Sequence, residues 1–165
     1  MTTQPLHARR SNGLLAAAIS IALALAAGGI GGFATASSVA TWYTGLEKPA
    51  FNPPNGVFAP VWTLLYILMA LAAWRVWRRV GFSAGRATLT LYGAQLILNL
   101  AWSLIFFGLR QPGFALVEVV VLLAAVAATT LAFWRIDRPA GAMMIPYLAW
   151  VSFASLLNFE IWRLN

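Results

Sequence analysis

Five apolar runs, each about 20 residues long, follow one another along this 165-residue chain and are bounded by Arg, Pro or Gly. A run of that length crosses the roughly 30 Å hydrocarbon core of a bilayer as a helix. Continuous Leu, Ala and Val runs lack the alternation of barrel strands. The runs are Leu14–Ala36, Val57–Trp77, Ala87–Gly108, Phe114–Trp134 and Ala140–Trp162. The sequence therefore predicts an all-α integral membrane bundle of five transmembrane helices.

The composition excludes the other broad classes. Only 9% of the residues are charged, against about 25% in soluble domains, so charges cannot cover a water-soluble surface. Disordered chains are poor in apolar residues, whereas 61% of this chain is hydrophobic. Residues 1–12 are expected to form an N-terminal tail, and residues 13–165 a single transmembrane domain.

The first apolar run has an alternative interpretation as a cleaved signal peptide. Arg9 and Arg10 precede it, and Ala34-Thr35-Ala36 resembles a cleavage site. The apolar stretch is longer than the roughly 7–15 residues of such a peptide, and further spans follow it. A retained first helix is therefore the favoured interpretation.

The cations are unevenly divided between the two ends of the predicted bundle. One side carries Arg9, Arg10, Arg75, Arg78, Arg79, Arg86, Arg135 and Arg138, and the other carries Lys48, Arg110 and Arg163. The positive-inside rule then predicts a cytoplasmic N-terminus and an outside C-terminus in a bacterial inner membrane. The net charge of +7 is therefore attributed to orientation and anionic lipid, not to nucleic acid.

The connection between the first two runs is long and unusual in composition. Residues 37–56 contain three prolines together with Trp42, Tyr43 and Phe51. Prolines reduce the conformational entropy of a loop, and a long loop in a compact fold is usually functional or disordered. Because the aromatic rings argue against disorder, we expect an ordered lid over the outer ends of the helices.

Polar and aromatic side chains form stripes at helical spacing on three of the predicted spans. They are Trp62, Tyr66 and Met69; Tyr92, Gln95, Asn99, Trp102 and Phe106; and Tyr147, Trp150, Ala154, Leu157 and Asn158. Buried amides need hydrogen-bond partners, so the stripes are expected to face the bundle interior. Most of these polar and aromatic side chains lie in the half of the bilayer beneath the long loop, and this arrangement predicts a covered pocket. Alternatively, the rings fill space and the amides hold helices together.

Two further features leave their interpretation open. Glu118 lies about one turn inside the fourth run. Pairing with a cation at the same end, or snorkelling to the interface, is the favoured interpretation, and a proton or ligand role is the alternative, because an intramembrane carboxylate is a functional candidate. Ala24, Gly28, Gly32 and Ala36 repeat every four residues. Such a face of small residues packs against another helix in the monomer or forms a dimer.

Several motifs occur in order from about residue 14 to the C-terminus. They are Trp42-Tyr43, Leu46, Lys48-Pro49, Phe51, Pro53-Pro54, Val61-Trp62, Leu65-Tyr66, Asn99, Trp102, Pro146-Tyr147-Leu148, Trp150, Leu157-Asn158-Phe159 and Arg163-Leu164-Asn165. Together they resemble the translocator protein family, also called the tryptophan-rich sensory protein, TspO/MBR or peripheral benzodiazepine receptor family. Phe159 stands where the sterol-recognition pattern of that family has Tyr.

The resemblance implies a five-helix membrane fold, often dimeric, that binds tetrapyrroles, sterols and synthetic benzodiazepine-site ligands. It places the family's pocket on Tyr43, Pro53, Trp62, Asn99, Trp102, Trp150 and Ala154. With the stripes and the lid, the candidate ligand-binding residues are Tyr43, Lys48, Pro53, Trp62, Tyr66, Asn99, Trp102, Tyr147, Trp150, Ala154 and Asn158.

The main hypothesis is a membrane protein that binds protoporphyrin IX or haem and acts in transport, scavenging or stress and light signalling. Asn99 would be a polar anchor and Lys48 a cation for propionates. No catalytic residue is assigned. Alternatives are a light-dependent porphyrin-degrading enzyme and, less favoured, a proton-coupled transporter using Glu118.

The chain has no cysteine and its one histidine, His7, lies in the tail, so a tetrapyrrole is expected to bind without histidine ligation. No metal, obligatory cofactor or nucleic acid is expected. The expected partners are the lipid bilayer and a second copy of the chain.

Overall fold

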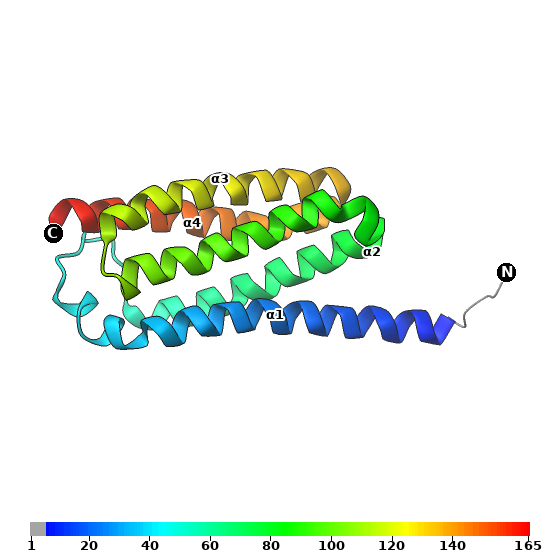
Figure 1. The fold of residues 1–165 in the computed structure, drawn as a ribbon, viewed down its shortest axis with the longest axis horizontal. Coiled ribbons are helices and arrows are strands. Elements are labelled where there is room, and N and C mark those ends of the chain that lie inside the picture. Colours follow the sequence, from blue (N-terminus) through cyan, green and yellow to red (C-terminus); the bar gives the residue numbers. More distant parts are fainter. Residues whose placement is uncertain (1–5) are drawn as a thin grey trace.

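The protein is an elongated bundle of α-helices that run alongside one another (Figure 1). The computed structural model describes the backbone of residues 6–165 and the side chains of residues 15, 17–33 and 35–165. Its elements are α1 (Leu6–Ala40), the 3-10 turn η1 (Tyr43–Gly45), α2 (Asn55–Ser103), the π-helical turn η2 (Leu104–Gly108), α3 (Pro112–Ile136) and α4 (Arg138–Leu164). The predicted all-α membrane bundle is confirmed.

The longest element, α2, folds back on itself at Gly81, whose φ of 72° is readily adopted only by glycine. The bend divides α2 into a first arm (residues 55–80) and a second arm (residues 82–103), which return side by side in Figure 1. The sequence predicted two separate spans ending at Trp77 and beginning at Ala87. Instead, both helices continue to Gly81, because a single glycine reverses the chain without a longer loop.

Among the described residues, three helical stretches are long and apolar enough to cross a membrane. They are Asn55–Gly108, Pro112–Ile136 and Arg138–Leu164, and the broken pair Ala17–Phe33 with Thr35–Gly45, bent by 44°, is a further candidate. The first of these has 54 residues and would be about 80 Å long if straight. Its bend at Gly81 makes two arms of membrane-spanning length, so the described chain has the five helical segments that the sequence predicted.

The ends of the first helix differ from the prediction. α1 begins at Leu6 and ends at Ala40, so it extends beyond the predicted span at both ends and the lid shortens to residues 41–54. Residues 1–5 of the predicted tail lie outside the described residues, as do the side chains of His7, Arg9 and Arg10.

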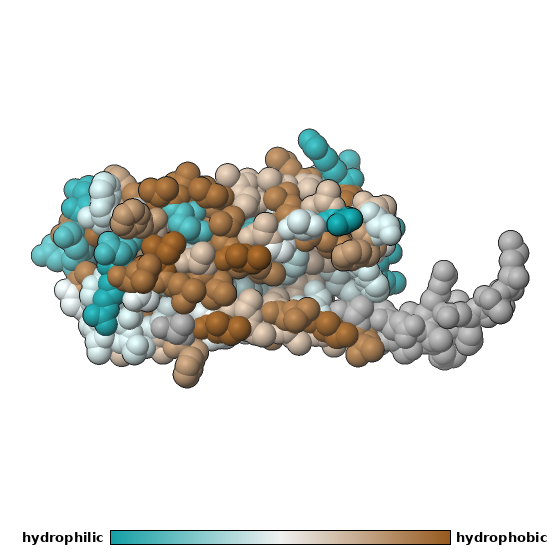
Figure 2. All heavy atoms as spheres, viewed as in Figure 1, coloured by the Kyte–Doolittle hydropathy of each residue, from teal (hydrophilic) through white to brown (hydrophobic). Residues whose placement is uncertain are grey.

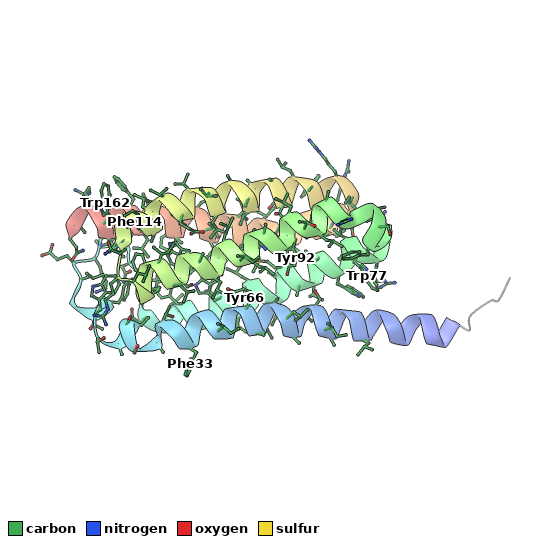
Figure 3. The ribbon with its side chains drawn as sticks, in the orientation of Figure 1. Phe33, Tyr66, Trp77, Tyr92, Phe114 and Trp162 are labelled. Atoms are coloured by element: carbon green, nitrogen blue, oxygen red, sulfur yellow. The ribbon has the colours of Figure 1, made fainter. Side chains whose placement is uncertain are left out.

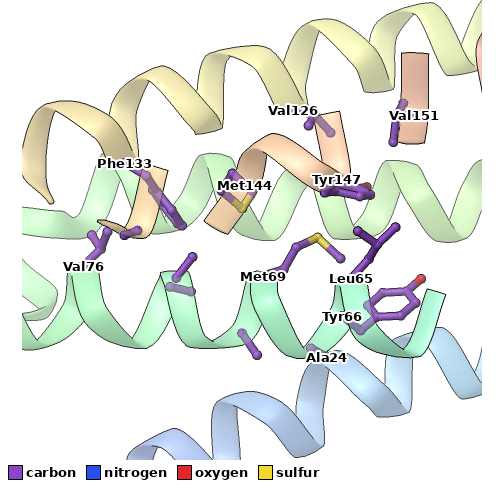
Figure 4. Packing of buried hydrophobic residues seen from close by; sticks show 14 of the residues in the cluster. Ala24, Leu65, Tyr66, Met69, Val76, Val126, Phe133, Met144, Tyr147 and Val151 are labelled. Carbon is purple, nitrogen blue, oxygen red and sulfur yellow. The ribbon is translucent and has the colours of Figure 1, made fainter. Parts of the chain in front are cut away.

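The core lies where α2, α3 and α4 meet. Met69, Val126, Phe133 and Tyr147 are completely buried, and Figure 4 shows them converging from the three helices. α1 joins this core through Ala24, which is 1% exposed. Outward-facing side chains are largely apolar in the middle of the bundle and more hydrophilic at its two ends (Figure 2), as expected for a protein that crosses a bilayer.

The end of the bundle near Gly81 is held by an ion pair. Arg75 Nε donates to Asp137 Oδ2 at 2.8 Å, and Arg75 Nη2 donates to Asp137 Oδ1 at 3.3 Å. Asp137 is buried at the junction of α3 and α4. This two-pronged contact ties the first arm of α2 to that junction.

Candidate ligand-binding cavity

A cavity of about 590 Å³ lies in the half of the bundle beneath the lid. It is enclosed by α1, both arms of α2, η2 and α4, with Tyr43 of η1 above it. Eight candidate residues line it: Tyr43, Trp62, Tyr66, Asn99, Trp102, Trp150, Ala154 and Asn158. The volume falls within the range of small-molecule sites, about 300–1,000 Å³.

Aromatic rings form much of the cavity wall. Trp62 of the first arm of α2 lies 6.4 Å from Trp150 of α4, centroid to centroid, with the ring planes nearly perpendicular. Phe58 packs against Trp150 at 5.9 Å, and Tyr66 against Trp62 at 5.8 Å. These edge-to-face and tilted arrangements suit the ring quadrupoles. They give the cavity an apolar and fairly rigid wall.

Asn99 is the polar centre of the cavity floor, although only 2% of it is exposed. The Tyr66 hydroxyl donates to Asn99 Oδ1, and Asn99 Nδ2 donates to the Tyr147 hydroxyl at 3.1 Å. Tyr66 and Tyr147 come from different helices, as Figure 4 shows. The amide thus joins both arms of α2 to α4, as expected for a buried amide that must be hydrogen-bonded.

A second polar contact fixes the opposite wall. Trp102 Nε1 donates to Asn158 Oδ1 at 3.0 Å, and Asn158 Nδ2 donates to the Pro112 carbonyl at 2.8 Å. Asn158 therefore links the second arm of α2 to the start of α3. The Trp102 ring faces the cavity while its N–H is already paired.

The lid is tied down at two points. The Tyr43 hydroxyl donates to Asn52 Oδ1 at 2.8 Å, and the Tyr43 ring packs 5.6 Å from that of Phe107. Farther along, Glu47 N donates to Asn165 Oδ1 at 3.0 Å, and Asn165 Nδ2 donates to the Glu47 carbonyl at 3.1 Å. The predicted ordered lid is therefore held against the ends of η2 and α4.

Three candidate residues do not line the cavity. Lys48 lies above it: its ammonium donates to the Leu46 carbonyl at 2.9 Å and lies 4.8 Å from the centroid of the Tyr43 ring. The Pro53 carbonyl accepts a hydrogen bond from Asn52 Nδ2 within the lid. Tyr147 is completely buried behind the wall, where it supports Asn99.

Part of the small-residue face of α1 packs within the monomer. Ala24 belongs to the core, whereas Gly28, Gly32 and Ala36 line the cavity. At Gly28 the α1 backbone approaches the Tyr66 ring so closely that a Cβ atom would lie 2.7 Å from Tyr66 Cδ2. Ala24 and Gly28 therefore pack inside the bundle, whereas Gly32 and Ala36 are exposed; a dimer formed through this face stays a prediction.

Phe58, Phe107 and Phe153 also line the cavity, although the sequence analysis did not select them. Phe58 lies four residues before Trp62, so the stripe already identified on that span could have been extended to it. Phe153 follows Trp150 by three residues and could have been found in the same way. Phe107 could not, because η2 departs from α-helical periodicity.

Glu118 has no partner within the described part of the chain. Its two carboxylate oxygens are buried and have no hydrogen-bond partner among the described residues. The ion pairs among the described residues are Arg75–Asp137 and Arg163–Glu160. The expected pairing of Glu118 with a cation at the lid end is therefore not present in the structure.

Comparison with known proteins agrees with this architecture. The model of the TspO/MBR family matches residues 20–163. The tryptophan-rich protein TspO of Chlorobaculum tepidum is 43% identical over 156 residues, which cover 92% of this chain and 97% of the relative. The translocator protein of Homo sapiens is 44% identical over 126 residues, 75% of each chain.

A further relative is the tryptophan-rich sensory protein of Cereibacter sphaeroides. It is 48% identical over 124 residues, which cover 75% of this chain and 77% of the relative. The family model spans almost the whole described bundle, including the cavity and the lid. This chain is therefore an integral membrane protein of the TspO/MBR family.

Proposed function

We propose that this protein binds a flat, hydrophobic tetrapyrrole such as protoporphyrin IX or haem in the cavity beneath the lid. The observation that carries the proposal is a cavity of about 590 Å³ whose wall combines Trp62, Trp102 and Trp150 from three helical segments. Planar faces of this kind stack on a planar macrocycle and bury its apolar surface. Related proteins are named for translocation and for sensing, so binding would serve transport, scavenging or signalling.

The hydrogen-bonding capacity of the wall supports a mainly apolar guest. The Asn99 amide already serves two tyrosines, and Trp102 Nε1 serves Asn158. Within the described part of the chain, the indole N–H groups of Trp62 and Trp150 donate to no protein acceptor. Two N–H donors therefore remain available to orient a guest whose affinity comes chiefly from ring contact and burial.

The test is titration of the purified protein, in the dark, with protoporphyrin IX, haem and a sterol in parallel, followed by tryptophan fluorescence and absorbance. Trp150→Ala is expected to weaken protoporphyrin binding tenfold or more, because it removes a central ring of the wall. Trp150→Phe keeps a ring without the N–H and is expected to fall between the wild type and Trp150→Ala.

The matched control is Trp162→Ala. Trp162 is 51% exposed and does not line the cavity, and in Figure 3 it lies at the end of the bundle. Its loss should leave affinity unchanged. Thermal unfolding first shows whether both proteins are folded. If they are, equal affinities of wild type and Trp150→Ala for protoporphyrin would contradict the proposed site. Loss of the porphyrin absorbance only under illumination, dependent on Trp62, would instead indicate the degradative alternative.

We also propose that the end bearing Gly81 faces the cytoplasm. The described cations Arg75, Arg78, Arg79, Arg86, Arg135 and Arg138 flank that end, whereas Lys48, Arg110 and Arg163 flank the lid end. This bias supports an outside lid by the positive-inside rule. Because the chain has no cysteine, a single introduced cysteine in the lid, labelled by an impermeant reagent on intact cells, tests the orientation directly.

A further inference from the structure

The exposed residues among the described lining of the cavity fall along one seam. These six residues are Gly29, Gly32, Ala36, Asn55, Ala59 and Thr63. All six belong to α1 or to the first arm of α2. The lining residues contributed by the second arm of α2, η2 and α4 are buried or half-buried. The opening therefore runs between α1 and the first arm of α2.

The two edges of this seam are regular. The α1 residues follow one another at intervals of three and four, and the α2 residues at intervals of four, so each set lies on one helical face. Seven or eight residues of helix span about 11 Å. Five of the six edge side chains are Gly, Ala or Thr, so little projects across the opening. The seam is a narrow slit edged by backbone and small side chains.

The surface beside the slit is apolar. Phe33 is 89% exposed and follows Gly32 directly, while Leu64 is 57% exposed and follows Thr63. Figure 3 shows Phe33 pointing away from the bundle. Exposed aromatic and aliphatic side chains on membrane-spanning helices contact lipid. The slit therefore opens toward the hydrocarbon region.

Unlike the slit, the route into the cavity from the aqueous side is closed by the lid. Tyr43 is buried and its hydroxyl is held by Asn52. The lid is also joined to the end of α4 by the two Glu47–Asn165 hydrogen bonds. A guest arriving from the aqueous side would have to displace these contacts, whereas a guest in the bilayer meets an opening that already exists.

We propose that the guest of the cavity enters sideways from the bilayer, edge first, through the slit between α1 and the first arm of α2. The small residues Gly32, Ala36, Ala59 and Thr63 then select guests by thickness and admit planar molecules in preference to bulky ones. This inference rests on the proposed function, because it assumes that the cavity holds a planar apolar guest.

The test places a bulky side chain on each edge, in Gly32→Leu and Ala59→Leu. A Cβ atom at Gly32 meets nothing within 4 Å, so the start of the side chain has room. The matched control is Gly93→Leu, where a Cβ atom also meets nothing within 4 Å and which does not line the cavity. Each protein is reconstituted in vesicles, and fluorescence quenching is followed in stopped flow after mixing with vesicles that carry protoporphyrin IX.

A blocked entrance is expected to slow association and dissociation together by tenfold or more, so that the equilibrium affinity, which is the ratio of the two rates, changes far less than either rate. The Gly93→Leu protein should behave as wild type. Unchanged rates in both edge variants would overturn the proposal. A loss of affinity at unchanged association rate would also overturn it, because the edges would then be part of the binding wall rather than its entrance.

A second measurement does not depend on porphyrin binding. A spin label attached at Ala59→Cys in this cysteine-free chain should be more accessible to oxygen than to a water-soluble nickel chelate, as at the lipid-facing reference Leu64→Cys. Preferential access of the chelate at position 59 would show a water-filled mouth and overturn the proposal. If wild type binds no porphyrin but the label shows lipid access, the proposed function fails while the lateral opening stands.

Discussion

Replacing Gly28 by alanine tests how tightly α1 is fitted against the cavity wall. The new Cβ atom would lie 2.7 Å from Tyr66 Cδ2 and 3.0 Å from Tyr66 Cζ, closer than carbon atoms pack. The Tyr66 ring is 8% exposed and packs against Trp62, so the free space beside it is the cavity that it lines. Either α1 moves outward or the ring moves toward the cavity and strains its hydrogen bond to Asn99.

The magnitude follows from three contributions. Overpacking a well-filled site costs about 1–3 kcal/mol, and loss of a buried hydrogen bond adds about 1 kcal/mol. Alanine regains roughly 0.5–1 kcal/mol over glycine within a helix. The net expectation is a destabilisation of about 1–3 kcal/mol, together with weaker protoporphyrin binding because Tyr66 and Trp62 move.

The assay is thermal unfolding in detergent combined with the porphyrin titration, using Gly29→Ala as the control. A Cβ atom at Gly29 meets nothing within 4 Å, so this variant should be as stable as wild type or slightly more stable, through helix propensity alone. Equal stability of Gly28→Ala and Gly29→Ala would refute the reasoning, since it would mean that α1 is not held against Tyr66.

Three further predictions concern other parts of the bundle. Arg75→Gln should lower stability by about 1–3 kcal/mol, less than for a fully buried pair, because the Arg75 side chain is 35% exposed while the carboxylate of Asp137 is left buried; chemical unfolding showing no change would contradict this. Glu118→Gln should leave thermal stability unchanged or raised, since it keeps the shape and removes an unpaired carboxylate; a marked loss would reveal a partner. Gly141→Ala should cost about 1–3 kcal/mol, because its Cβ atom would lie 2.7 Å from the backbone Cα of Trp134, and near-wild-type unfolding would argue against this close packing of α3 and α4.

The sequence predicted the spans and most of the cavity wall because both depend on local chemistry. Continuous apolar runs of this length are helices in lipid, and the amides of Gln95 and Asn99 on one helical face were expected to turn inward rather than toward lipid. The inward orientation is confirmed, with Gln95 and Asn99 almost completely buried. Their use as a ligand site remains a prediction.

What the sequence did not predict depends on backbone geometry and on the lid. The chain reverses at Gly81 through a positive φ, which no pattern in the local sequence predicts. Lys48 was expected to reach the cavity, but its ammonium is engaged by the Leu46 carbonyl, a contact set by how the loop folds. Glu118 was expected to find a cation, and the arrangement of the helices leaves it none among the described residues.

The π-helical turn at the end of α2 has a consequence for how related proteins can vary. Phe106 and Phe107 are consecutive, yet both line the cavity and both pack against Tyr43. A π-turn carries one residue more than the corresponding α-turn, and here that extra residue supplies a second ring to the roof. A deletion of one residue within η2 would rotate the two phenylalanine rings at the lid end of the cavity. The tryptophans of the wall would stay in register, so the lid end of the cavity can vary in size and chemistry separately from its wall.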